Sequence, residues 1–433
     1  MKVQKCIWWV FTIVLFFSGL ELAVSSGQTE TTKIDVYVTD QTETLPQRNF
    51  WSEFTEKFSE KFPNYNVLME NIPADASPEM FYQTKIAAGE FPDVAKVWQP
   101  ALFIENDIIL EMPKELYDML IDPDPFLVDG KLYVAPVNMG LLGMWYNKDL
   151  FKDIGIETLP GSWAQFMNTC EKIDQSGVEP LGMAGRAGWY MAGAYLFQWV
   201  PVTYGPEPNW PKLKNEGKVK FNNPVTRRSF EQYGEAMKYW QAGAMSATYD
   251  QIKGLFVNQE IAIQTNGGIY NAAEVETGDL VPPFEVGYLT PPQDNPDDRR
   301  LNYFGDNLYV INKSLKGEKL QAAIDFVMFF FSDEIYPDWL YATSMMTTVK
   351  GYEDYVLPYQ NPIAKTMVKE IKTAAEVHGV AIHGHAAQGD NIWPPGTREM
   401  MEKIVMEFAA GNDDLEELMD LFDEHWDKAV HTK

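Results

Sequence analysis

The sequence contains very little cysteine. Only Cys6 and Cys170 occur in 433 residues, and Cys6 falls within a predicted export segment. We therefore expect no intramolecular disulfide in the mature chain. A chain of this length can be stable without one, because the fraction of surface buried on folding rises with size. At roughly 100–200 residues per domain, the length predicts two domains or more.

Basic residues are also scarce. The chain has 35 Lys and Arg against 62 Asp and Glu, a formal net charge of −27. A surface of this sign repels phosphate backbones, so we expect no nucleic-acid partner. It equally disfavours docking on anionic lipid. Charge of this kind indicates solubility and says nothing about the fold.

The sequence lacks the common catalytic motifs. It has no G-x-S-x-G, no H-E-x-x-H, no phosphate-binding G-x-x-x-x-G-K-[ST], and no G-x-G-x-x-G after the first predicted strand. We therefore predict that the chain is not an enzyme and needs no cofactor. Two alternatives stay open at this point. The many carboxylates could include a glycosidase pair of a secreted carbohydrate-active enzyme, or the chain could be a lectin-like glycan-binding module.

Histidine is rare, and three of the five histidines cluster near the C-terminal third. His378, His383 and His385 form the pattern H-x4-H-x-H. This spacing matches no standard zinc motif. We interpret the segment as a solvated loop and predict no metal site.

Long apolar runs are limited to the N-terminus. Two lysines precede an apolar stretch over residues 7–20, and small residues follow at 23–27. This order is typical of a secretory signal peptide, which we assign to residues 1–26. The run is shorter than the ~20 residues that a spanning helix needs. We therefore expect an exported, periplasmic or extracellular protein, with an uncleaved membrane-associated N-terminal segment as the alternative.

The hydrophobic periodicity predicts an α/β protein. Apolar residues alternate at 33–39, recur at helical spacing over 49–62, and continue as strand, helix and strand at 65–69, 78–88 and 93–98. This order indicates a lobe with a largely parallel sheet. Later helices are expected at 162–173, 226–241, 317–332, 363–378, 397–410 and 413–430, and later strands at 131–135, 141–146, 261–264, 286–289 and 309–311.

One ordered set of motifs resembles a known family. Residues 130–136 read GKLYVAP, 146–151 read YNKDLF, and Gly155-Ile156 and Pro160-Gly161-Ser162-Trp163 follow. In this order they resemble extracellular solute-binding protein family 1, the sugar-type, maltose-binding-protein-like receptors of ATP-binding cassette importers. Phe91-Pro92-Asp93-Val94 and Phe221-Asn222-Asn223-Pro224 agree with the same family, so the resemblance covers nearly the whole mature chain.

The resemblance implies a two-lobed periplasmic-binding-protein fold of type II, in which each lobe has a central sheet flanked by helices. The first lobe would comprise residues 27–138 plus 309–350, and the second residues 139–308 plus 351–433. Hinges would fall near 138–143 and 307–309. The ligand would bind in the cleft between the lobes, and closure would follow. The resemblance implies a monomer that takes a small polar ligand, a mono- or oligosaccharide, to the membrane permease subunits of an importer.

A sugar offers hydroxyl groups and flat C–H faces, so its site needs aromatic rings and planar polar side chains. Aromatic residues make up 14% of the chain, with 13 Trp. Many family members have Trp at the position of Ile269, which puts the usual stacking ring in doubt here. The predicted ligand contacts lie at strand ends, helix starts and crossings: Thr39, Asp40, Trp98, Gln99, Asn138, Arg186, Trp189, Tyr190, Asn266, Gly267, Gly268, Tyr270, Phe304, Asp306, Asn307 and Trp393.

Overall fold

The computed structural model describes residues 33–40, 44–72, 78–382 and 391–431. Its strands form one continuous path in the order β2-β1-β3-β10-β6-β8-β7. Strands β1 (Ile34–Asp40), β2 (Tyr65–Asn71) and β3 (Val94–Val97) are parallel, as the sequence predicted. The long strands β6 (Ala135–Asn147) and β10 (Leu301–Ile311) are antiparallel to each other, and β10 is also antiparallel to β3. The sheet is therefore mixed, because these two strands pass between the lobes in opposite directions.

The second lobe completes the sheet with short strands. β7 (Glu179–Gly182) pairs in parallel with β8 (Ile261–Gly268), and β9 (Val286–Leu289) runs antiparallel to β6. β11 (Met346–Thr347) and β12 (Val380–Ile382) pair with β6 and β10, respectively. A separate hairpin joins β4 (Leu127–Val128) to β5 (Lys131–Leu132). Both crossing strands thus collect partners from either lobe.

The first lobe has an aromatic core against its sheet. Helix α1 (Leu45–Lys61) begins four residues before the predicted start, because Thr44 and Gln47 form a capping box. Its Phe54 and Phe58 pack on Phe326 of α12 (Gly317–Phe330). The other helices of this lobe are α2 (Pro78–Ala88), α3 (Ala101–Glu105), α4 (Lys114–Met119) and α13 (Tyr336–Thr343).

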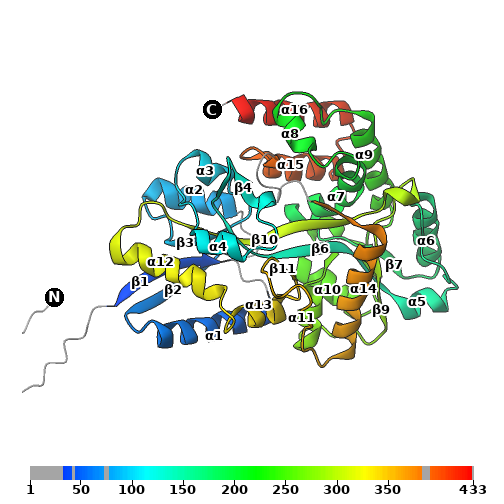
Figure 1. The fold of residues 1–433 in the computed structure, drawn as a ribbon. Helices are drawn as coiled ribbons and strands as arrows, with labels where there is room; N and C mark the ends of the chain where they lie inside the picture. Colours follow the sequence, from blue (N-terminus) through cyan, green and yellow to red (C-terminus); the bar gives the residue numbers. More distant parts are fainter. Residues whose placement is uncertain (1–32, 41–43, 73–77, 383–390, 432–433) are drawn as a thin grey trace, which may run out of the picture.

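The second lobe is built around α7 (Gly188–Tyr204), whose side chains are buried on nearly every face. It packs on α9 (Pro224–Met237) and on α15 (Thr397–Ala409). The remaining helices are α5 (Lys148–Asp153), α6 (Trp163–Gln175), α8 (Trp210–Asn215), α10 (Tyr249–Val257), α11 (Asn271–Glu276), α14 (Pro362–His378) and α16 (Leu415–His431). Figure 1 shows α15, α16 and α8 along one edge of this lobe.

The crossing strands divide two hydrophobic cores. Met139 belongs to the core of the first lobe, whereas Leu141, two residues later on β6, belongs to that of the second. On β10 the change falls between Leu301 and Leu308. Figure 1 shows the two lobes side by side, joined by β6 and β10. No helix in the described ranges is long and apolar enough to cross a membrane.

Candidate ligand site

A polar contact joins the two lobes at the end of β3. Gln99, which follows β3 in the first lobe, is 4% exposed. Its Nε2 lies 3.4 Å from both carboxylate oxygens of Glu399, in the first turn of α15 of the second lobe. These distances are long for an N–H···O bond, so they leave room to shorten if the lobes move together. We call the junction at which these two elements meet the cleft.

The Gln99 amide has unused hydrogen-bonding capacity. Its Oε1 is buried and has no hydrogen-bond partner among the described residues. Leaving a buried acceptor without a donor costs about 1–3 kcal/mol. Such atoms are rare in native proteins, and one cause is a partner that is not part of the chain. The Oε1 atom therefore marks the cleft as a place where a ligand donor would be stabilising.

Trp98 precedes Gln99 and is half-buried. The Lys96 ammonium lies 4.6 Å from the centre of its ring, a distance at which a cation is attracted to the aromatic face. Lys96 is itself buried and lies 3.6 Å from Asp40 Oδ1. The ring therefore sits on a fixed base rather than on a mobile loop.

The predicted contacts Thr39 and Asp40 belong to that base. Asp40 is 2% exposed and accepts hydrogen bonds from Trp51 Nε1 at 2.5 Å and from the Tyr309 hydroxyl at 3.2 Å. Thr39 is fully buried, with its Oγ1 2.8 Å from the Tyr82 hydroxyl. Both side chains thus support the end of the sheet beneath Trp98.

The predicted segment 186–190 lies next to α15 in the second lobe. A Cβ at Gly188 would come 2.9 Å from a carboxylate oxygen of Glu402, so the start of α7 rests directly on α15. Arg398 Nε donates to Glu402 Oε1 at 3.0 Å beside it. Glu402 and Glu399 are three residues apart on one helix, hence neighbours on its surface. The structure therefore brings Gln99 and the start of α7 to the same end of α15.

The three predicted side chains of this segment have different surroundings. Arg186 is exposed and Trp189 is half-buried, with its ring 5.5 Å from that of Tyr249. Tyr190 is fully buried and its hydroxyl donates to the Thr265 carbonyl. Burial raises the pKa of Tyr190 well above its usual range, so this residue is a neutral core group. Trp189 is the aromatic residue of the segment that keeps an accessible surface.

The predicted loop 266–270 ends β8. Asn266 is 2% exposed, adopts φ 49°, and donates from Nδ2 to the Tyr190 carbonyl at 3.3 Å. A Cβ at Gly267 would overlap the Trp145 ring, and one at Gly268 would overlap the ring of Tyr270. Both positions therefore need glycine for close packing. Tyr270 is half-buried, whereas Ile269 is fully buried.

The predicted residues on the crossing strands are mainly internal. Asn138 and Asn307 are fully buried, and Asn307 Nδ2 donates to Asn138 Oδ1 at 3.0 Å. Asp306 pairs in register with Asn138. Phe304 is half-buried and occupies the space over Gly140, where a Cβ would overlap its ring. The Asn138–Asn307 bond ties β6 to β10 at the point where both strands leave the first lobe.

Trp393 lies outside the cleft, in the core of the second lobe. It is 2% exposed, its ring packs against those of Trp199 and Trp426, and its Nε1 donates to the Tyr204 hydroxyl at 3.1 Å. An aromatic cluster of this size removes the ring from contact with a ligand. The prediction of a ligand contact at Trp393 is therefore replaced by a packing role.

Other predictions concern cysteine and metal. Cys170 is buried, and burial raises the pKa of its thiol, which agrees with packing on α6. His383 and His385 lie outside the described residues. Within the described ranges, no group of three His, Cys, Asp or Glu residues is arranged to hold a metal ion.

Sequence reasoning missed Lys96, Glu399 and Glu402. Two of these are members of a large set of carboxylates, and Lys96 sits inside a strand. The one available signal was the start of a helix at Thr397 after Pro394-Pro395-Gly396, which places the acidic residues in its first two turns. The contact of Glu399 with Gln99 after β3 depends on how the two lobes are arranged. Local sequence patterns do not predict that arrangement.

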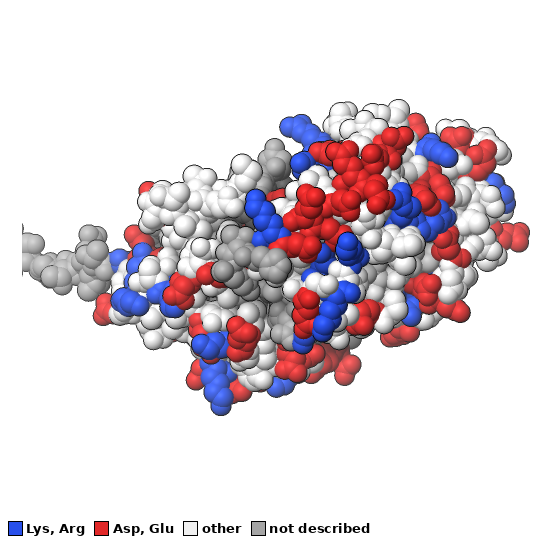
Figure 2. Space-filling model, turned by 90° about the horizontal axis from the view of Figure 1, so that it is seen from above, with Lys and Arg blue, Asp and Glu red and all other residues white. Residues whose placement is uncertain are grey.

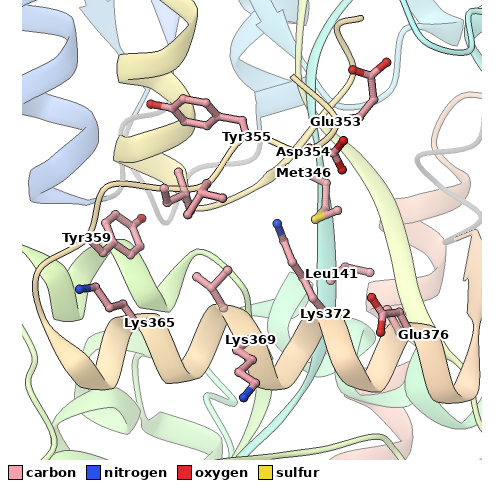
Figure 3. A pocket seen from close by; sticks show the side chains of 14 residues that line it. Leu141, Met346, Glu353, Asp354, Tyr355, Tyr359, Lys365, Lys369, Lys372 and Glu376 are labelled. Atoms are coloured by element: carbon pink, nitrogen blue, oxygen red, sulfur yellow. The ribbon is translucent and has the colours of Figure 1, made fainter. Parts of the chain in front are cut away.

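A hollow of about 680 Å³ lies between α14 and the segment 353–359. We call it the α14 pocket. It contains none of the predicted ligand contacts. Figure 3 shows Lys372 pointing from α14 towards Met346 and Asp354, Lys365 beside Tyr359, and Lys369 directed away. Its lining carries both charge signs, together with the highly exposed Val356.

The charge of the surface is uneven. Figure 2 shows Asp and Glu gathered over the second lobe on the face seen from above, with basic side chains scattered among them. Helix α16, along this edge, contributes Glu416, Asp420 and Asp427, and Asp427 pairs with the buried Lys214. Part of the acidic excess is therefore structural.

Comparisons with known proteins identify the family and the fold. A multiple sugar-binding protein of Streptococcus mutans is 23% identical over 386 residues, covering 82% of this chain and 83% of that protein. The melibiose/raffinose/stachyose-binding protein MelE of Bacillus subtilis is 22% identical over 364 residues, covering 80% and 82%.

Solved structures share the fold at low identity. A chitin oligosaccharide binding protein superposes with a TM-score of 0.78 at 19% identity, covering 92% of this chain and 99% of that one. The solute-binding protein RafE in complex with raffinose gives 0.72 at 16% identity, covering 92% and 100%. The family profile of bacterial extracellular solute-binding proteins matches residues 42–337, and the chain belongs to that family.

Proposed function

We propose that the chain is an exported receptor that captures a mono- or oligosaccharide between its lobes and delivers it to an ATP-binding cassette importer. The observation that carries the proposal is the cleft itself. Gln99 reaches across it to Glu399 beside the half-buried Trp98, and its Oε1 lacks a donor. An aromatic ring and a planar amide are the groups that a sugar requires.

The relatives support the same ligand class. Their names include multiple sugars and melibiose, raffinose and stachyose. The ligand would favour the closed form through contacts that only that form makes on both lobes. The closed monomer would then dock on the permease subunits. In this proposal the lobes comprise residues 27–138 plus 309–350 and 139–308 plus 351–433, and export depends on the segment 1–26.

Thermal-shift screening followed by calorimetry tests the proposal. The mature chain is mixed with raffinose, stachyose, chitin oligosaccharides, galactose and, as a charged non-sugar control, spermidine. A ligand at 100 times its Kd stabilises the native state by about 2.7 kcal/mol, so at least one sugar should raise the Tm with a stoichiometry of one. No stabilisation by any carbohydrate contradicts the proposal.

Product analysis separates the receptor from the enzyme alternative. The same sugars are incubated with the protein and analysed by chromatography. We expect recovery of intact ligand, because the relatives are named as binding proteins. Released shorter sugars would overturn the receptor and favour a carbohydrate-active enzyme.

A further inference from the structure

The Gln99 side chain is held in one of its two amide orientations. Its donor end, Nε2, faces both oxygens of the Glu399 carboxylate at 3.4 Å. A carboxylate accepts hydrogen bonds and, when ionised, cannot donate. Turning the amide over would set Oε1 against two other acceptors. Glu399 therefore selects the orientation in which Oε1 is the atom left for a ligand.

The atom so presented is an acceptor in a dry place. Gln99 is 4% exposed, and its Oε1 is buried with no donor among the described residues. A ligand group that donates a hydrogen bond to Oε1 removes the cost of that unmet acceptor. A ligand group that can only accept a hydrogen bond, such as an ether oxygen, cannot donate to Gln99 Oε1. The free-energy cost of the unmet acceptor therefore remains.

From this arrangement we infer that Glu399 is a positioning residue that makes the cleft selective for a ligand hydroxyl acting as donor to Gln99 Oε1. The inference rests on the proposed function, since it specifies how the same cleft reads its sugar. It assigns Glu399 an effect on ligand choice through another side chain. The ligand class is a neutral glycan with a free hydroxyl at the position facing Gln99.

The carboxylate is well placed for this role. Glu399 lies in the first turn of the 13-residue helix α15, where the helix dipole stabilises a negative charge. Helix α15 is fixed in turn by its packing on α7 and α16. The charge that orients Gln99 is thus part of a rigid element of the opposite lobe. Discrimination would be strongest when the lobes are closed and the 3.4 Å contacts shorten.

The test compares the bound glycan with its singly O-methylated analogues by calorimetry. A methyl ether keeps the oxygen as an acceptor and loses the donor. In the native protein we expect one position at which methylation weakens binding at least tenfold. In Glu399→Gln the amide of residue 399 can pair with either end of Gln99, so the same penalty should fall below threefold.

Two further variants make the result specific. Glu424→Gln removes an exposed carboxylate from α16 and should leave the methylation penalty unchanged. Gln99→Met keeps a similar shape without the amide and should abolish the penalty, which gives an independent measurement if Glu399→Gln folds poorly.

The outcomes separate the inference from the proposed function. If the native protein binds glycan and the methylation penalty in Glu399→Gln is as large as in the native protein, the inference alone is overturned. Native protein that binds no glycan overturns both. A penalty that disappears in both variants and persists in Glu424→Gln supports the positioning role.

Discussion

The cleft and the α14 pocket differ in whether their polar groups can find hydrogen-bond partners in water. The α14 pocket is roomy, about 680 Å³, but its charged groups reach solvent and Val356 is 83% exposed. The cleft is marked by a single amide that is 4% exposed and lacks a donor for Oε1. Water can satisfy the exposed groups of the pocket, whereas it has little access to the amide. The proposed ligand site therefore rests on an unmet buried acceptor at the junction of the two lobes, and not on volume.

The largest expected change in glycan affinity comes from removal of the Trp98 ring. Trp98→Ala should weaken glycan binding by about 30-fold, since truncating a central aromatic contact costs about 2 kcal/mol or more. Tyr355→Ala removes a ring from the α14 pocket and should leave the Kd within twofold. Calorimetry with the best sugar measures both. Equal losses of glycan affinity in Trp98→Ala and Tyr355→Ala would contradict the assignment of the ligand to the cleft.

The next effect is expected on stability rather than on affinity. Asn138→Ala leaves Asn307 Nδ2 and Trp339 Nε1 without the oxygen that both approach, at 3.0 and 3.4 Å. Loss of this buried acceptor should cost about 2 kcal/mol in the free energy of unfolding. Denaturant unfolding measures it, with the exposed Asn106→Ala as control. A large loss of affinity at unchanged stability would instead return Asn138 to the ligand site.

A smaller effect is expected from the cleft amide. Gln99→Met removes the acceptor that a ligand hydroxyl would use, so glycan affinity should fall by about five- to tenfold, the value of one hydrogen bond. The free protein should be as stable as the native one, because the unmet Oε1 is removed at the same time. A substantial loss of stability without a change in Kd would contradict a ligand role for Gln99.

The smallest effect is expected in the α14 pocket. Among the residues that the structure describes, no ion pair involves Lys365 or Lys372. The double variant Lys365→Gln/Lys372→Gln should therefore change neither the glycan Kd beyond twofold nor the Tm beyond a degree or two, as is usual for surface substitutions. A large change in sugar affinity would show that the two hollows act together.

Local patterning predicted most of the architecture. Helices with one apolar face, such as α9 and α14, were predicted to within four residues at each end, because their periodicity is strong. Most of α7 was not predicted, because it is buried all round and shows no polar face. The continuous mixed sheet also escaped prediction, since pairing of β10 with β3 and β6 joins segments far apart in sequence.

The ligand site was predicted less fully, for a physical reason. Trp98 and Gln99 were predicted because they follow a strand end, where side chains of an α/β lobe reach a cleft, and their contact with a ligand stays a prediction. Trp393 and Asp40 have the right chemistry, but their side chains are packed inside a lobe. Glu399 is one of many carboxylates in the sequence, and only the tertiary structure shows that it contacts Gln99 of the other lobe. Residue type can suggest sugar contacts, whereas orientation and lobe proximity come from tertiary structure.

The place of β10 in the sheet has a consequence for the order in which the chain can fold. β10 lies between β3 of the first lobe and the crossing strand β6, yet it begins only at Leu301. A nascent chain that ends before this strand has β3 and β6 but no strand to join them. Because pairing of distant segments is slow, the N-terminal lobe should stay incomplete until about three quarters of the protein has been made. Completion of the sheet in the first lobe should therefore depend on a strand that is synthesised late.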